Sequence, residues 1–595
     1  MKSLKIKFIQ VSAILFMIGV VVSCSEDFLK PKPLSIFMPE NTYTNKTAMI
    51  SLLNNCRHDL KYEFLDNYCL LLTEYFMSDI GIYGEMYSGG LKDFDTQVTP
   101  TSVSQGQVIG NPSYWNSGWS AIKSANVVIS RYDKASYESE EDKNEILAEA
   151  YFHRAYWYYR LVHQYGDVPF IDGEINRPTV DLYSMSRKSI LNRMVTDMEF
   201  AVQHLPVSVN FGEVSRAAGY HLLTKLYLSM GQFDDAIRAA TEVIDKSGLA
   251  LMKTRFGTRI NPSFPGSNGQ VSVYEGNVLW DLFRKENISI AENTEGILIG
   301  QDRVDLRDKG STSGASARTR NYGPDWLGIP GMIRSGPLYE YLLRGQAFCR
   351  PAPYHSYTLW SDAGEDLRHI WPNWFPMDSL YYNDPEQDNY GQRPVPRPIT
   401  DDSIRQYFPY QYYKIYVPDE IRDPKTNNNS QGGFTDVYIF RLAETYLLRA
   451  EAYWWTNNME KAKDDINEVR GRANAPLITT ADVSIDYILD ERARELYSEE
   501  PRKTELTRIT YIMADQNRDG YSTNNMHLNN FFYDRVMRRN EFYGQQIEVP
   551  SGKFKMSPFH YLWPIPQTSI DANVEGHINQ NLGYAGSENN IPPLE

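Results

Sequence analysis

Three glutamates at four-residue intervals form the arrangement in this sequence that comes closest to a pair of catalytic carboxylates. Glu491, Glu495 and Glu499 would share one face of a helix predicted over residues 483–500, where one carboxyl group could donate a proton and another accept one. The arginines among them are Arg492, Arg494 and Arg502. Because opposite charges three or four residues apart pair along a helix, we interpret this segment as an ion-paired helix that binds neighbouring loops.

The sequence holds no other signature of catalysis. None of the ten histidines stands in a metal-binding spacing such as H-E-x-x-H, and neither a glycine-rich phosphate loop nor a G-x-S-x-G elbow occurs. We therefore predict a non-catalytic protein that needs no cofactor. The sequence leaves open whether a structural calcium ion orders one of the loops.

Aromatic side chains are the second group of residues that could have a function, in this case the binding of a ligand. Phe, Tyr and Trp make up 13% of the chain, with 42 tyrosines and 11 tryptophans. Their flat faces suit the CH groups of a sugar ring, while Tyr OH and Trp NH groups bond hydroxyls. Rings in helices are mostly core residues, so we expect ligand contacts from rings in loops, with Asp79, Asn321 or Asp325 bonding hydroxyls. The candidate ligand-binding residues are Tyr83, Tyr87, Tyr322, Trp326, Tyr354, Tyr357, Trp360, Trp371 and Trp374.

The first 24 residues have the pattern of an export signal. A lysine-rich start precedes an apolar run from Phe8 to Val22, which is shorter than the ~20 residues that span a bilayer. The run ends in Val-Val-Ser-Cys, a lipobox whose cysteine is acylated after cleavage. We therefore predict a signal peptide over residues 1–23 and lipid attachment at Cys24, where several acyl chains would anchor the protein stably.

Helical hairpins are predicted to position the loop residues. Apolar residues recur with the period of an α-helix in several segments, and short turns join those segments into pairs. A glycine turn followed by an aromatic residue, at Gly231 and Phe233, resembles a tetratricopeptide hairpin. The predicted pairs are 146–165 with 186–204, 215–230 with a helix from Phe233, and 439–454 with a helix from Met459.

These helices fall into two blocks, residues 146–247 and 435–508. Between them, residues 250–434 are rich in Gly, Pro, Asn and Tyr, and their prolines exclude long helices. Residues 70–115 form a second loop-rich stretch. We therefore predict a single domain over residues 24–595, a helical scaffold interrupted by a large insertion.

Several charged and sulfur-bearing residues are interpreted as parts of the scaffold. Arg154 and the Gly-Asp turn at Asp167 would stabilise a helix end, and Arg441 and Glu444 are spaced for a pair on one helix face. With Cys24 acylated, three cysteines remain, too few for a disulfide framework. At most one pair among Cys56, Cys69 and Cys349 could form a disulfide.

The overall charge limits the class of partner. The chain carries a net charge of −15 and no basic stripe along any predicted element. Binding to a phosphate backbone depends on clustered Lys and Arg side chains. Nucleic acid is therefore excluded as a partner.

Motifs along the whole chain then occur in a recognisable order. They are the acidic start with Phe28-Leu29 after the lipobox; Trp115, Trp119, Ile122 and Asn126; Arg154-Ala155 leading to Tyr165-Gly166-Asp167-Val168-Pro169; Arg441-Leu442-Ala443-Glu444 with Ala450-Glu451-Ala452; Asn467-Glu468-Val469-Arg470 with Arg472-Ala473; Glu491-Arg492 with Arg494-Glu495-Leu496; and Trp563-Pro564-Ile565-Pro566 before Gln580-Asn581-Leu582-Gly583-Tyr584. This order resembles the SusD/RagB family of outer-membrane nutrient-binding lipoproteins. Leu582 replaces a proline of the family pattern, and Pro501 stands where a small or polar residue is more usual.

The resemblance implies a mostly α fold, in which tetratricopeptide-like hairpins form a scaffold and the loop-rich insertion forms the ligand face. It also implies a protein without catalytic activity, lipid-anchored on the outer face of the outer membrane. There it would act as a lid on a SusC-like TonB-dependent transporter. Together with the loop aromatics, this predicts capture of oligosaccharides or polysaccharides and their delivery to that transporter.

Three other functions stay open at this point. The protein could bind peptides or protein fragments for uptake, since some relatives serve such transporters. It could be a surface glycoside hydrolase, which requires two loop carboxylates roughly 5–9.5 Å apart in a groove. It could also be a structural lid without a ligand of its own.

Overall fold

The computed structural model describes residues 43–65, 69–84, 91–104, 113–302, 317–394, 400, 403–417 and 434–595. Within these ranges long helices dominate, and the strands form only two-stranded pairs. The predicted mostly α fold is confirmed. Cys24 and Tyr87 lie outside the described residues.

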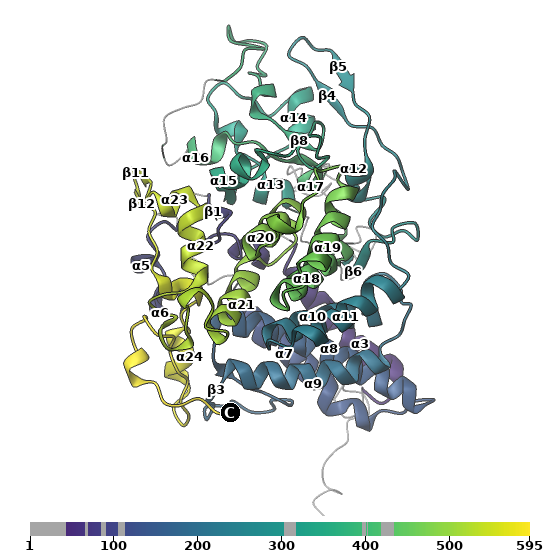
Figure 1. Cartoon of the computed structure of the whole chain (residues 1–595), viewed down its shortest axis with the longest axis vertical. Helices are drawn as coiled ribbons and strands as arrows, with labels where there is room; N and C mark the ends of the chain where they lie inside the picture. The colour runs from purple at the N-terminus through teal and green to yellow at the C-terminus, as the bar shows by residue number, and fades with distance from the viewer. Residues whose placement is uncertain are drawn as a thin grey trace, which may run out of the picture.

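Eleven of the described helices form the body of the molecule, in its lower and central parts (Figure 1). They are α3 (Lys46–Tyr62), α7 (Tyr114–Arg131), α8 (Glu140–Tyr165), α9 (Arg187–His204), α10 (Arg216–Ser229), α11 (Phe233–Lys246), α18 (Leu442–Trp455), α19 (Met459–Arg472), α20 (Ile485–Leu496), α21 (Arg502–Asp515) and α22 (Phe531–Arg539). Helix α8 packs between α7 and α9, α10 packs on α9 and α11, and α11 packs on α18, which pairs with α19. The predicted hairpins are therefore confirmed, and helices from both blocks lie side by side.

Local sequence signals explain where these helices begin and end. Serines at positions 113, 139, 186 and 215 precede four of them, and each side chain accepts a hydrogen bond from a backbone N–H in the first turn. The α10–α11 turn uses Gly231 at φ 70°, and the α18–α19 turn uses Asn457 at φ 59°. Both residue types tolerate this left-handed conformation, which reverses the chain.

Three predicted helix boundaries are wrong, and the first is the start of α8, which lies at Glu140 and not at residue 146. Residues 439–441 belong to a strand, β10 (Val437–Arg441), so the helix starts only at Leu442. The helix predicted over 483–500 ends at Leu496, because Ser498 takes a left-handed conformation at φ 64° and Pro501 follows. Glu499 therefore does not share a helix with Glu491 and Glu495.

The chain between α11 and α18 forms the upper part of the molecule (Figure 1). Its described short helices are α12 (Val278–Leu282), α13 (Arg318–Tyr322), α14 (Pro337–Leu342), α15 (Pro353–Ser356), α16 (Ser403–Gln406) and α17 (Tyr412–Ile415). The antiparallel pairs in the described structure are β1 (Gly81–Tyr83) with β7 (Cys349–Pro351), β2 (Val168–Pro169) with β3 (Ser184–Met185), β4 (Ser263–Pro265) with β5 (Val271–Val273), β6 (Gly296–Gly300) with β10, β8 (Trp374–Phe375) with β9 (Tyr410–Gln411), and β11 (Glu548–Val549) with β12 (Gly552–Lys553). As the prolines predicted, no long helix occurs in the described part of this region.

A buried ionic network joins this upper region to the helices. Glu495 on α20 binds the guanidinium groups of Arg368, Arg441 and Arg472, with Arg441 Nη1 2.6 Å and Arg368 Nη1 3.1 Å from its carboxylate oxygens. Glu295, just before β6, binds Arg441 at 2.5 Å and Arg472 at 2.8 Å. Burial acts to raise the pKa of Glu495, but the charges of Arg472, Arg441 and Arg368 hold it well below its usual value.

The neighbouring carboxylates follow the same pattern. Glu491 binds Arg368, Arg470 and Arg494, each at 2.7–2.9 Å. The ion-paired interpretation of this segment is therefore confirmed for Glu491 and Glu495. Off the helix, Glu499 binds Arg441 at 2.7 Å and Lys414 at 2.5 Å.

The predicted pair between Arg441 and Glu444 is wrong. Arg441 ends strand β10 and points to Glu295, Glu495 and Glu499, whereas Glu444 binds His221 and Lys225 of α10. Since the helix begins one residue after Arg441, the two side chains do not share a helix face. The scaffold interpretation holds for Arg154, which binds Asp197 of α9 at 2.6 Å.

The structure also bears on the turn at Asp167, on the three cysteines and on whether a helix could span a membrane. The Asp167 carboxylate accepts a hydrogen bond of 2.7 Å from the backbone N–H of Arg187 at the start of α9, so it serves the scaffold through a distant helix and not through its own turn. Cys56, Cys69 and Cys349 are buried, and no disulfide joins them in the described structure. Across the ranges that the structure describes, no helix is both long and apolar enough to cross a membrane.

Close packing between α7 and α8 gives a first testable prediction. A Cβ atom added at Gly118 would lie 2.9 Å from Cγ and Cδ2 of Leu161. We expect Gly118→Ala to lower the free energy of unfolding by about 1–3 kcal/mol, because the two helices must separate to fit it. In Gly471→Ala, on α19, the nearest atom lies 3.9 Å away. This control should be neutral or stabilising by up to about 1 kcal/mol. Thermal unfolding followed by circular dichroism measures both, and equal stability of the two variants would contradict the packing argument.

Candidate functional site

The loop aromatics predicted from the sequence are largely buried in this structure. Tyr322, Trp326, Tyr354, Trp360 and Trp374 are between 1% and 7% exposed. Tyr83 and Trp371 are partly buried against the core, and only Tyr357, at 56%, is well exposed. Ring faces packed inside the fold cannot stack on a sugar without a rearrangement, so their role as ligand contacts stays a prediction.

Many of the polar atoms on these rings are used within the fold. Trp326 Nε1 donates to the Leu343 carbonyl at 2.8 Å and Trp360 Nε1 to the His355 carbonyl at 2.9 Å. The Tyr354 hydroxyl donates to Asp490 at 2.9 Å. The rings therefore pack the insertion, which has little regular secondary structure to organise it.

The structure brings some of the predicted rings together and separates others. Trp360 and Trp374 lie 5.5 Å apart, and His369 stacks on Trp360 at 4.9 Å. Tyr322 instead contacts Tyr75 and Tyr497. The rings do not form one continuous platform.

The proposed hydroxyl partners are also engaged elsewhere. Asp79 is fully buried and bound by Arg502 and Arg535 at 2.7 and 2.6 Å. Asp325 binds Arg405 at 3.0 Å. The Asn321 amide donates to the Cys69 sulfur at 3.8 Å. In the described structure, Asp79 and Asp325 serve ion pairs of the fold.

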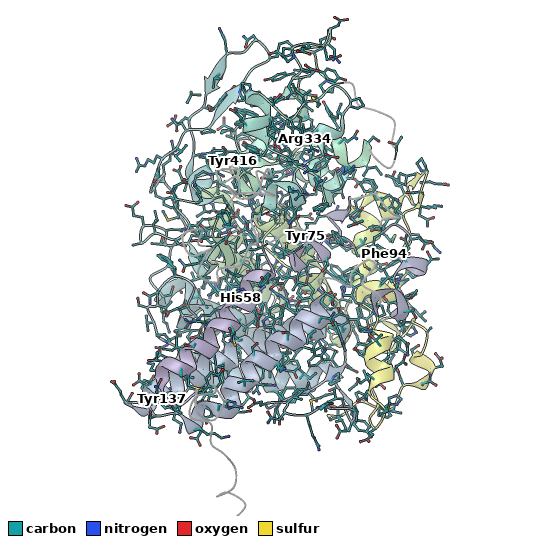
Figure 2. All side chains as sticks on the ribbon, turned by 180° about the vertical axis from the view of Figure 1, so that it is seen from behind. His58, Tyr75, Phe94, Tyr137, Arg334 and Tyr416 are labelled. Atoms are coloured by element: carbon teal, nitrogen blue, oxygen red, sulfur yellow. The ribbon has the colours of Figure 1, made fainter. Side chains whose placement is uncertain are left out.

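A pocket of about 270 Å³ opens in the upper region, between α12, β4, α14 and the end of α17. Tyr416, labelled in the upper part of Figure 2, lies at the opposite end of the molecule from Tyr137 near the base. Sequence reasoning placed the ligand face in this insertion but did not select this pocket. The lining residues are Ile260, Asn261, Pro262, Ser263, Trp280, Arg284, Lys285, Glu286, Tyr341, Tyr416, Val417 and Thr435.

Aromatic rings form the wall of this pocket. Trp280 stacks on Tyr412 and Tyr416, with ring centroids 6.0 and 5.9 Å apart, and Tyr341 stacks on Tyr412 at 4.8 Å. The Asn277 side chain begins α12 by accepting from the backbone N–H groups of Leu279 and Trp280. The Trp280 indole N–H donates to the Ile260 carbonyl at 2.9 Å, which fixes the ring against the pocket edge.

The pocket has a buried floor and an exposed rim. Trp280, Arg284 and Tyr341 of the floor are 2%, 4% and 8% exposed. Ile260 at the rim is 44% exposed, and Asn261, Ser263 and Glu286 are exposed beside it. Among the described rings that line the pocket, only Tyr416 is partly exposed, so a sugar face could pack against Tyr416 while the polar rim bonds its hydroxyls. A volume near the lower end of the roughly 300–1,000 Å³ range of ligand pockets suits about one sugar unit of a chain.

Sequence reasoning missed Trp280 and Tyr416 because it searched for rings in glycine- and proline-rich loops. The signal that could have found them is a four-residue spacing. Trp280 precedes Arg284, and Tyr412 precedes Tyr416, by one helical turn each. Short helices of this kind carry too few apolar residues to stand out by period.

A second cavity of about 400 Å³ lies near the base, between α7, the β2–β3 connection and α24 (Gln567–Ala572). Its lining is mostly apolar and includes Trp115, Trp119, Ile122 and Ile171. Few polar side chains point into it, so it is a poorer match to a ligand covered with hydroxyl groups. In the part of the chain that the structure describes, no cluster of three His, Cys, Asp or Glu residues could hold a metal ion.

Comparison with protein families identifies two matching regions. Residues 349–584 match a family described as the SusD family, and residues 92–228 match a family described as starch-binding and associating with the outer membrane. The pocket lies mainly in the chain between these two regions.

Individual relatives agree with these matches. The chain is 24% identical over 523 residues to SusD-like protein P2 of Formosa agariphila, covering 85% of this chain and 88% of that protein. It is 33% identical over 150 residues to the starch-binding protein SusD of Bacteroides thetaiotaomicron, covering 25% and 22% of the two chains.

Solved structures show the same fold. A laminarin-binding SusD-like protein superposes with a TM-score of 0.62 at 18% identity, covering 91% of this chain and all of the other. Surface glycan-binding protein A from Bacteroides uniformis gives a TM-score of 0.62 at 17% identity, covering 90% and 99%.

Proposed function

This chain belongs to the SusD family, and from that premise we propose that it captures glycans at the cell surface and passes them to a SusC-like TonB-dependent transporter. The observation that supports the proposal is the aromatic pocket of the upper region, which Trp280, Tyr341 and Tyr416 line. Relatives of similar fold are named for binding laminarin and surface glycans, which supports a glycan ligand here.

The lipobox supports the proposed location. An acylated Cys24 would hold the protein on the outer membrane, and a glycan-binding face in the insertion could then meet polysaccharide outside the cell. Stacking on two or three rings gives a few kcal/mol, so we expect dissociation constants of micromolar to millimolar order. Weak binding suits a protein that must release its ligand to a transporter.

The proposal is tested by affinity electrophoresis and calorimetry against a panel of purified polysaccharides and their oligomers, with a peptide digest as a second ligand class. Retarded migration and a measurable binding heat with at least one glycan are expected. If no glycan binds while peptides do, glycan capture is refuted and peptide uptake takes its place.

Tyr416 provides a site-specific prediction within the same assay. It is partly buried, so Tyr416→Ala removes one wall of the pocket while leaving Trp280 and Tyr341 in place. We expect roughly tenfold weaker glycan binding, ~1.4 kcal/mol, with little change in thermal stability. Tyr183→Ala, at an exposed tyrosine near β3, is the matched control and should bind normally. Equal binding by both variants would place the glycan site elsewhere.

A further inference from the structure

Arg284 is one of four buried arginines in the described structure that form no ion pair with a carboxylate, and it is the one of them that lines the aromatic pocket. Arginine side chains with no more than 2% exposure each pair with a carboxylate in the described structure; they are Arg160, Arg368, Arg405, Arg441, Arg492, Arg502, Arg508 and Arg535. Arg284 is 4% exposed, yet it takes part in no ion pair with any residue that the structure describes. Buried charges are normally paired, because leaving water costs free energy that a partner must offset.

The contacts that Arg284 does make are neutral. Its Nε donates to the Trp280 carbonyl at 3.1 Å and its Nη2 to the Tyr413 carbonyl at 2.5 Å. The guanidinium carbon lies 3.9 Å from the centroid of the Trp280 ring and 5.1 Å from that of Tyr416. These contacts hold the group in one orientation, but none supplies a negative charge. Burial accordingly lowers the pKa of Arg284, although nearby Tyr416, Tyr412 and Glu286 act in the opposite direction.

Arg284 also lines the aromatic pocket, and the other charges there do not cancel it. The charged residues among the described lining are Arg284, Lys285 and Glu286, two cations and one anion. Lys285 and Glu286 lie 3.9 Å apart and offset each other at the rim. Among the described lining residues, the charge of Arg284 is therefore left without a counter-charge, beside the rings of Trp280 and Tyr416.

We propose that this pocket recognises a negatively charged group on a glycan, either the carboxylate of a uronic acid or a sulfate ester, through the guanidinium of Arg284. Both groups present oxygens that a guanidinium binds in its plane. The inference rests on the proposed glycan-binding function and specifies the ligand class of its site. Salt screens the repulsion between such a ligand and exposed acidic residues beyond about 8 Å, so the net charge of −15 opposes binding little. At contact distance, the attraction of the buried Arg284 guanidinium for the negative group exceeds the repulsion from distant acidic residues.

Three other buried arginines, Arg187, Arg318 and Arg350, likewise form no carboxylate pair among the described residues, but they are not part of the pocket lining. Arg350 donates to the carbonyls of Ile404 and Pro351 and lies 4.7 Å from the Phe408 ring centroid. It therefore resembles Arg284 in burial and in neutral contacts. Arg350→Met is the matched control for Arg284→Met, since both remove one buried guanidinium.

The test is calorimetry with two pairs of oligosaccharides. One pair is a uronic-acid oligomer and the same oligomer with its carboxyl groups reduced to alcohols. The other is a sulfated oligomer and its desulfated form. We expect the wild-type protein to bind the charged member of at least one pair about tenfold or more tightly than the neutral member. The pair that shows the difference identifies the source of the charge.

The variants then test whether Arg284 is the cause of the preference for charged oligosaccharides. Arg284→Met should bind charged and neutral members equally, Arg284→Lys should keep part of the preference, and Arg350→Met should keep all of it. Thermal unfolding checks that each variant is folded. If Arg284→Met does not fold, the inference is judged from the affinities of Arg284→Lys and of the wild-type protein for the charged and neutral oligosaccharides. Equal wild-type affinity for charged and neutral members, or an unchanged preference in Arg284→Met, overturns the inference. Absence of binding to every glycan would instead refute the proposed function itself.

Discussion

Replacing Glu495 by alanine is expected to lower the free energy of unfolding by about 3–5 kcal/mol. Its carboxylate binds Arg368, Arg441 and Arg472, and each of these guanidiniums is buried. The substitution removes the carboxylate that all three guanidiniums share, although Glu295, Glu491 and Glu499 keep their own contacts with them. Urea unfolding followed by tryptophan fluorescence measures the loss.

The matched control for this prediction is Glu468→Ala. Glu468 also binds a cation, Lys253 at 3.2 Å, but both side chains are largely exposed. Exposed pairs contribute at most about 1 kcal/mol, so this variant should be close to wild type. If Glu495→Ala unfolded at the same urea concentration as Glu468→Ala, the buried network would not hold the insertion on the helices.

The stability of the wild-type protein and that of Glu495→Ala should depend differently on pH. Because the pKa of Glu495 in the folded protein lies below that of an unfolded glutamate, about 4.3, its stabilisation is complete above about pH 5 and is lost as the pH falls toward the folded pKa. The stability difference between wild type and Glu495→Ala should therefore shrink as the pH is lowered from 5 to 3. A difference that stayed constant over this range would contradict the assignment.

Replacing Cys24 by serine is expected to release the protein from the membrane. The lipobox predicts several acyl chains on this sulfur, and each buried CH₂ group contributes ~0.8 kcal/mol to anchoring, whereas a serine cannot take the same thioether-linked lipid. We expect more than about nine-tenths of Cys24→Ser to fractionate as soluble protein, where the wild type sediments with outer membranes. Immunoblots of fractionated cells provide the measurement.

Cys56→Ala serves as the control for the anchor. Cys56 is 1% exposed, and burial raises the pKa of its thiol, so it stays neutral and shielded from modification. This variant should remain in the membrane fraction and remain accessible to added protease on intact cells. Membrane retention of Cys24→Ser would show that the protein is held there by something other than a lipid on this residue.

The sequence predicted the helical scaffold well because its signals are local. Serine caps, glycine turns and apolar residues at helical spacing all act within a few residues, and α10 and α11 follow the predicted ranges closely. The boundary error at residues 439–441 has a long-range cause, whereas the helix end at Leu496 follows from Ser498 and Pro501 just beyond it. Strand β10 forms only because β6, far away in sequence, pairs with it.

The site was harder to predict because burial is a property of the whole fold. Trp326 and Trp360 lie in short 3-10 helices, Trp326–Gly328 and Thr358–Trp360, and the insertion folds over them and uses their ring nitrogens internally. Nothing local distinguishes them from Trp280, whose neighbours Tyr412 and Tyr416 come from the other end of the insertion. The correct region could be predicted from its composition, but the pocket required the contacts between distant segments.

The contact between α11 and α18 has an evolutionary consequence. It holds the two ends of the insertion side by side, so the scaffold does not depend on how long the intervening chain is. Closing a loop twice as long costs only about 0.6 kcal/mol more. Insertions of different length and ligand preference could therefore be exchanged on one scaffold, provided that residues equivalent to Glu295, Arg368 and Lys414 keep their ionic contacts with it. A family built in this way can acquire new nutrients while its helices remain unchanged.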